Sequence, residues 1–174
     1  MRKIASVIDH ELTWVQPSAF KSEYELRFGD ELVGTLRFPK FLSSRAETET
    51  ADGRWTFERV GFWKRRTVVR ASGAETDLAV YTHNAWKGGG TLELQAGGKF
   101  MVEVSLWKGT LEFKTETGET LVHIKNRGVF RHSANVQMFR KALQVAELPL
   151  MVPLGLYLFV MMQRDSAAHA AASG

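Results

Sequence analysis

The sequence predicts an all-β fold, a closed antiparallel barrel of about 11 to 12 strands with a buried hydrophobic helix through its centre. Two observations support this prediction. Short segments of alternating apolar and polar side chains follow one another from about residue 12 to residue 138, each ended by glycine, proline, asparagine or aspartate. A single uncharged apolar segment then follows at residues 148–162. A long series of antiparallel strands leaves unpaired edges unless the sheet closes, and a wide barrel needs something to fill its interior.

The first strands are indicated by residues 12–15 and by two alternating segments at 24–28 and 34–38. Gly29-Asp30 connects the second and third segments, and a glycine in the first position of a two-residue loop is typical of a type II′ hairpin. Asp52-Gly53 predicts a second hairpin, because this dipeptide favours the positive φ angles of a tight turn.

Further strands continue the same pattern to residue 138. Gly97-Gly98 is interpreted as a turn, and the run of glycines at 88–90 is interpreted in the same way. The expected strands lie at residues 45–50, 55–58, 63–71, 77–82, 92–94, 100–106, 111–113, 121–125 and 129–138.

The apolar segment predicts a helix over residues 149–163 that is enclosed by protein. A helix with no polar face must be surrounded on all sides, and at about 1.5 Å per residue this run reaches only about 22 Å, against about 30 Å for a bilayer core. Glu147 before it and Arg164 after it limit any extension. A membrane anchor is the alternative interpretation. We expect Pro149 and Pro153 in the first helical turn and a frayed tail over residues 166–174.

Composition indicates one domain over residues 1–174, with 44% hydrophobic residues and a formal net charge of +4. A slight basic excess is compatible with an anionic partner without requiring one. The absence of cysteine excludes disulfides and thiolate metal sites. No signal peptide precedes the first strand, so a cytoplasmic location is expected, with peripheral association at the inner face of the membrane as an option.

No catalytic or cofactor motif is recognisable. The histidines are far apart in the sequence, so no metal site is expected, and the glycine runs are not followed by the helix that a phosphate-binding loop needs. No Gly-x-Ser-x-Gly element is present. The sequence therefore favours a protein that is not an enzyme and that has no cofactor.

One cluster of cations suggests a binding surface. On an extended strand Lys64, Arg66 and Arg70 share one face, and Trp63 stands beside them. This basic stripe predicts a site for anionic phospholipids, where each cation contributes about 1 kcal/mol. Three alternatives stay open: a solvated strand face without a ligand, a protein-interaction scaffold that uses another surface, and a binder of nucleic acid.

Two segments, GRWTFERVGFW at residues 53–63 and ELPLMVPLGLYL at residues 147–158, resemble uncharacterised bacterial members of the tubby-like superfamily. Phospholipid scramblases and LURP-one-related proteins are distant relatives in that superfamily. The resemblance implies a closed barrel threaded by a hydrophobic helix. It implies no single activity, because the relatives include phosphoinositide binders and proposed lipid movers, and no ligand-binding lysine or arginine is transferred to this sequence.

Overall fold

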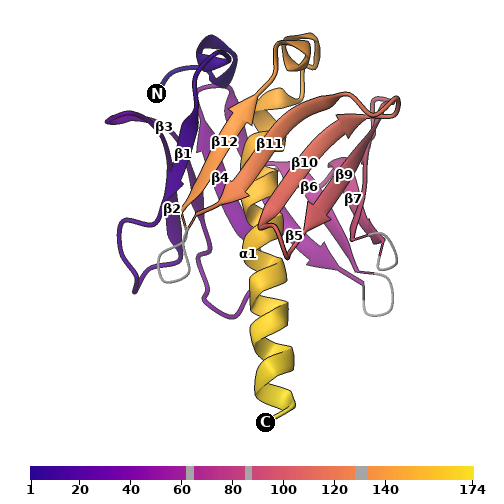
Figure 1. Ribbon diagram of the computed structural model, residues 1–174. Helices are drawn as coiled ribbons and strands as arrows, with labels where there is room; N and C mark the ends of the chain where they lie inside the picture. The colour runs from indigo at the N-terminus through magenta and orange to yellow at the C-terminus, as the bar shows by residue number, and fades with distance from the viewer. Residues whose placement is uncertain (62–64, 85–87, 128–132) are drawn as a thin grey trace.

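Twelve antiparallel strands form a closed barrel around one long helix in the computed structural model, which describes residues 1–61, 65–84, 88–127 and 133–174 (Figure 1). Each strand pairs with its neighbours in the sequence, and β1 pairs with β12 to close the sheet. The predicted fold class is therefore confirmed. The strands are β1 (Leu12–Val15), β2 (Glu23–Phe28), β3 (Glu31–Arg37), β4 (Ala46–Thr50), β5 (Gly53–Val60), β6 (Arg66–Ala71), β7 (Asp77–Asn84), β8 (Gly89–Leu94), β9 (Lys99–Ser105), β10 (Thr110–Thr115), β11 (Thr120–Asn126) and β12 (Ala134–Met138).

Because consecutive strands run in opposite directions, the connections between them alternate between the two ends of the barrel. The odd-numbered strands all run towards the end from which the helix emerges, which we call the exit end (Figure 1), and the described residues that follow them lie there. The other connections lie at the opposite end, together with two short 3₁₀ helices, η1 (Ile4–Val7) and η2 (Arg140–Gln144).

The helix α1 (Leu148–Ala172) enters the barrel at the end that carries η2 and leaves at the exit end (Figure 1). All residues from 150 to 161 are buried, as an apolar helix with no polar face requires. The prediction of an enclosed helix is thus confirmed. Within the described part of the chain, no helix combines the length and apolarity needed to cross a bilayer.

Two details of the predicted helix were wrong. The tail expected to fray is helical as far as Ala172, although it is exposed, because alanine has the highest intrinsic helix propensity. Pro149 occupies the first turn as expected, but Pro153 lies in the interior of the helix. The apolar core around Pro153 holds the helix in place despite the lost amide donor.

Two predicted turns also differ from the structure. Gly53 pairs with Thr50, so the loop residues are Ala51 and Asp52, and the Asp52 carboxylate accepts a hydrogen bond of 3.0 Å from the amide of Ile4. Gly53 is needed for space instead, since an added Cβ would lie 2.9 Å from the Trp55 ring.

The glycine run at 88–90 is a turn only at its first residue, because Gly89 and Gly90 belong to β8. A Cβ on Gly90 would lie 2.7 Å from the ring of Tyr81 and still closer to the carbonyl oxygen of Thr82. The glycine therefore makes room for a buried tyrosine inside the barrel.

The helix contacts two opposite parts of the barrel wall. Among the described residues, α1 packs closest against β3, β4, β5, β10 and β11. Gly155 makes the approach to β11 possible, since an added Cβ would meet the Cδ1 atom of Ile124 at 2.2 Å. The strands β6 to β9, which lie between these two parts of the wall, are not among those that α1 contacts most closely.

Candidate functional site

The basic stripe lies only partly within the described residues. Trp63 and Lys64 are outside them, whereas Arg66 and Arg70 lie on β6. Arg66 is exposed. The guanidinium of Arg70 forms ion pairs with Asp77 at 2.7 Å and with Glu58 at 3.9 Å, so its charge is largely compensated within the protein. Lipid binding by this stripe stays a prediction.

A different surface stands out at the exit end, where large apolar side chains extend into solvent from three connections. These connections are residues 16–22, 38–45 and 106–109. Monomeric proteins rarely gather exposed apolar side chains on one face unless that face binds something. The side chains are Phe20 (100% exposed), Phe41 (75%), Leu42 (93%), Leu106 (59%) and Trp107 (96%).

The exit end is also basic. Among the described residues of its connections none is acidic, and every charged one is an exposed lysine or arginine. Lysine and arginine beside exposed aromatic rings are typical of surfaces that contact the interface of an anionic bilayer. The cations are Lys21, Lys40, Arg45, Arg65, Lys108 and Arg127.

The opposite end has the reverse charge, and we call it the acidic end. Its two basic residues on the segment before α1 are already engaged, Arg140 with Asp9 at 2.9 Å and Lys141 with Glu119 at 3.2 Å. The barrel is therefore polarised along its length, which favours one orientation on a charged surface. The acidic residues of the connections are Asp9, Glu11, Asp30, Asp52, Glu75, Glu116, Glu119 and Glu147.

The segment 38–45 is fixed to the helix, so its apolar tips have a defined position. The hydroxyl of Tyr157 donates to the carbonyl oxygen of Ser44 at 2.9 Å, and Arg164 donates to the carbonyl oxygen of Ser43 at 3.1 Å. The Arg164 guanidinium lies 4.2 Å from the centroid of the Phe38 ring, and burial lowers the pKa of this arginine. Because these contacts hold the segment, little entropy is lost when its tips contact a partner.

A second contact fixes the helix where it leaves the barrel. Arg59 points inward from β5, and its Nη1 atom donates to both carboxylate oxygens of Asp165 on α1 at 2.9 Å. Arg65 lies 3.5 Å from the same carboxylate. Two cations around one anion leave a net positive charge beside the helix.

Beside this cluster lies an open pocket of about 710 Å³ at the rim of the barrel, which we call the exit pocket. Its apolar lining includes Val104, Leu106 and Met162, and its polar lining includes Asp165 and His169. The pocket lies between the part of α1 that leaves the barrel and the ends of β7 to β9. Its volume is within the range of about 300–1,000 Å³ that is usual for small-molecule sites.

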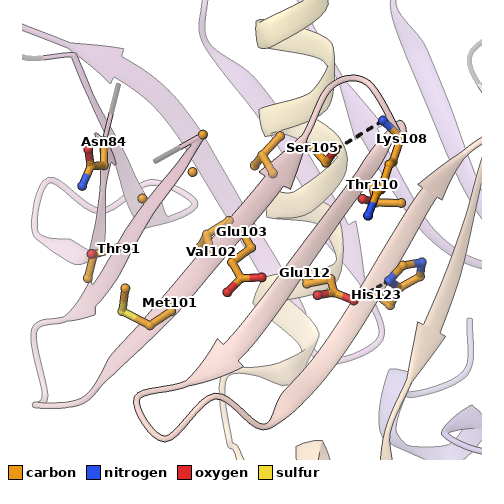
Figure 2. A pocket seen from close by; sticks show the side chains of 14 residues that line it. Asn84, Thr91, Met101, Val102, Glu103, Ser105, Lys108, Thr110, Glu112 and His123 are labelled. Carbon is orange, nitrogen blue, oxygen red and sulfur yellow. Dashed lines mark hydrogen bonds and ion pairs between the residues drawn. The ribbon is translucent and has the colours of Figure 1, made fainter. Parts of the chain in front are cut away.

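The outer wall has a groove of about 600 Å³ over β7 to β11, shown in Figure 2. Glu103, Glu112 and His123 form a row across three strands, because Glu112 pairs in register with both of the others. Lys114 lies 2.5 Å from Glu103 and 3.0 Å from Glu112, and His123 lies 2.8 Å from Glu112.

These contacts determine the electrostatics of the groove. Burial alone would raise the pKa of Glu112, but the hydrogen bonds with His123 and Lys114 outweigh burial and lower that pKa. The hydrogen bond to Glu103 raises the pKa of Lys114. The charged groups therefore satisfy one another, as in a structural network on a strand face.

No group of three or more histidine, aspartate or glutamate side chains within the described residues is placed to hold a metal ion. No protein-family model matches the chain, and no curated protein or solved structure matches it either.

The exit end was missed in the sequence because its members are separated by whole strands. The signal was nevertheless present. Once the strands are placed, every second connection belongs to the same end, and the connections after β1, β3 and β9 contain aromatic residues and lysine but no acid.

Proposed function

We propose that the protein is a non-enzymatic binding module that associates with anionic phospholipid surfaces through its exit end. The observation that supports this proposal is the coincidence, on one end of the barrel, of exposed apolar tips and basic side chains, opposite an acidic end. An anionic surface would attract the exit end and repel the other, so the barrel would stand upright with its tips in the interface.

The expected energies favour reversible, peripheral association. Each cation close to an anionic membrane contributes about 1 kcal/mol at low ionic strength. A phenylalanine or leucine side chain contributes about 1.5–3 kcal/mol when its burial is complete, and less at the level of the head groups. The favourable free energies of several cations and apolar side chains together exceed the entropy that the protein loses when it is held at a membrane. One or two such side chains do not supply enough.

Membership of the tubby-like superfamily is part of the proposal. A closed antiparallel barrel that encloses a hydrophobic helix is compatible with that fold, and residues 53–63 and 147–158 carry the resemblance in sequence. We further propose a cytoplasmic location, because the inner leaflet supplies the anionic lipid.

Co-sedimentation with vesicles tests the function directly. We expect the wild type to sediment with vesicles of phosphatidylcholine and phosphatidylserine at low salt, and not with phosphatidylcholine alone. The triple substitution Phe41→Ser, Leu42→Ser and Trp107→Ser should weaken binding at least about tenfold, since it removes apolar contact area from the interface. The matched control, Phe139→Ser with Leu143→Ser, changes exposed apolar residues at the acidic end and should bind as the wild type does.

Charge reversal supplies the second comparison. Lys40→Glu with Lys108→Glu should reduce binding about 10- to 100-fold at low salt, and Lys99→Glu with Lys141→Glu should have little effect although the net charge changes equally. All binding should weaken as salt shortens the Debye length to about 8 Å. If the wild type ignores phosphatidylserine vesicles at low salt, the proposal is wrong, and the protein-interaction and nucleic-acid alternatives take its place.

A further inference from the structure

Arg164 differs from the exposed cations of the exit end because its side chain is partly buried and no carboxylate pairs with it. It lies on α1 where the helix leaves the barrel, and burial lowers its pKa. Within the described residues it forms no ion pair, and its one hydrogen bond runs from Nη1 to the carbonyl oxygen of Ser43 at 3.1 Å. Arg59, also beside the helix, is by contrast paired with Asp165 at 2.9 Å. A cation that is partly removed from water without a counter-ion favours the binding of an anion.

The aromatic contacts of Arg164 leave most of its donors free. Its Cζ atom lies 4.2 Å from the centroid of the Phe38 ring and 5.8 Å from that of Phe41. A ring covers the face of a guanidinium, whereas the N–H groups point outward in its plane. Since Ser43 accepts only from Nη1, the edge formed by Nε and Nη2 has no partner among the described residues. Such an edge can donate two parallel hydrogen bonds to two oxygens of one phosphate group.

Three exposed cations lie on the two connections next to Arg164. These connections are residues 16–22 and 38–45, and a hydrogen bond of 2.9 Å from the amide of Phe38 to the carbonyl oxygen of Ser22 joins them. Neither connection contains an acidic residue, and none of the three cations forms an ion pair with a described residue. This side of the exit end therefore combines four cations without a counter-ion. The three exposed ones are Lys21, Lys40 and Arg45.

We propose that Arg164 binds the phosphate of a phosphomonoester lipid headgroup, of the kind that phosphatidic acid carries, with Lys40 and Arg45 supplying further positive charge. A phosphomonoester has three terminal oxygens and a charge of about −1.5 to −2 at neutral pH, so it can accept both hydrogen bonds of the arginine edge and still attract the other cations. The phosphodiester of other phospholipids has fewer free oxygens and less charge. The inference rests on the proposed function, because the site lies on the end that would face the bilayer, and it adds a preference for one class of headgroup.

Vesicles that differ only in headgroup test this preference. We expect the wild type to bind phosphatidylcholine vesicles that contain phosphatidic acid at least about fivefold more tightly than vesicles that contain phosphatidylserine at the same surface charge. Arg164→Lys keeps the charge but lacks the planar fork, so its two affinities should agree within about twofold. The matched control Arg45→Lys makes the same change in an exposed arginine of the same end and should keep the preference. Each result is a ratio of two affinities of one variant, so a smaller folded fraction does not alter it.

A soluble phosphomonoester is the other possible source of the same chemical group. Glycerol 3-phosphate carries the monoester without the lipid chains, and calorimetry measures its binding in solution. It should bind the wild type more weakly than the lipid does, because it gains nothing from the apolar tips, and it should not bind Arg164→Lys measurably. Equal affinity of the wild type for glycerol 3-phosphate and for the phosphatidic acid vesicles would overturn the lipid as the source.

The outcomes separate this inference from the proposed function. If the wild type binds the two kinds of anionic vesicle equally well, or if Arg164→Lys keeps the preference, the headgroup site is wrong and the proposed function is unaffected. If the wild type ignores both kinds of vesicle at low salt, the proposed function fails and the lipid headgroup fails with it. Calorimetry then decides about Arg164 itself: binding of glycerol 3-phosphate that is lost in Arg164→Lys would support a phosphate site there, and no binding would refute it.

Discussion

The contact between Gly155 and β11 leads to a quantitative prediction. An added Cβ at residue 155 would lie 2.2 Å from Ile124 Cδ1 and 3.1 Å from Phe113 Cε2, whereas carbon atoms pack at about 3.5–4.0 Å. Ile124 and Phe113 are both fully buried, so neither can move into solvent. Gly155→Ala should therefore overpack the core.

The expected magnitude is a balance of two terms. Overpacking costs about 1–3 kcal/mol, and replacing glycine by alanine inside a helix returns about 1 kcal/mol. We expect Gly155→Ala to lower the free energy of unfolding by about 0–2 kcal/mol. Ile124→Val alone should lower it by about 0.5–1.5 kcal/mol, because it removes the Cδ1 methyl group and leaves a small cavity.

The double variant gives the decisive measurement. With Ile124→Val present, the alanine methyl can occupy the space of the missing Cδ1. The loss in free energy of unfolding of the double variant should therefore be smaller than the sum of the two single losses, by at least about 1 kcal/mol. Chemical denaturation of the four proteins measures this coupling. Ile4→Val is the control, because Ile4 is equally buried but is not among the atoms next to Gly155, and it should combine additively with Gly155→Ala. Additive behaviour of Gly155→Ala with Ile124→Val would refute the close approach of α1 to β11.

Two further predictions concern the core and the outer wall. Leu156→Asp should prevent folding or soluble expression, because it places a carboxylate at a position that is 3% exposed inside the barrel. The control Ser166→Asp, on the exposed part of α1, should be tolerated. Thermal unfolding compares the two variants. Glu112→Gln should lower stability at neutral pH by about 1 kcal/mol or less, since it weakens the contacts with Lys114 and His123. The pKa of Glu112 is lowered in the folded state, so this contribution to stability is complete above the unfolded pKa of about 4.3 and disappears as the pH falls through the folded-state pKa. The wild type and the variant should therefore have the same free energy of unfolding in acid. A difference in stability that persists there would contradict the assignment.

Much of the fold could be predicted from the sequence because its strongest signals are local. Alternation identified the strands, and Gly29 and Gly97 identified turns, with φ angles of 56° and 91° in the structure. The enclosed helix followed from an apolar run that was too short to span a bilayer. The role of Gly90 could not be predicted, because it depends on the ring of Tyr81 on the neighbouring strand.

The candidate site was harder to predict because it depends on long-range placement. Arg70 resembled a free cation in the sequence, and its partners Glu58 and Asp77 became evident only from the pairing of β6 with both neighbours. The tips Phe41 and Trp107 are far apart in the sequence and come to one end only because the strands alternate in direction. The pattern of adjacent residues in the sequence indicates neither the ion pairs of Arg70 nor the gathering of the apolar tips at one end.

The position of α1 after all twelve strands has a consequence for how the chain folds. The strands are synthesised first, β1 can close the sheet only when β12 is available, and the apolar inner face stays uncovered until the last helix arrives. Such dependence on distant pairings slows folding and exposes intermediates to aggregation. An incomplete barrel also offers its interior to α1 of a second molecule, which is the geometry of a domain-swapped dimer. The segment that completes the core is thus also the segment by which two nascent chains can become entangled.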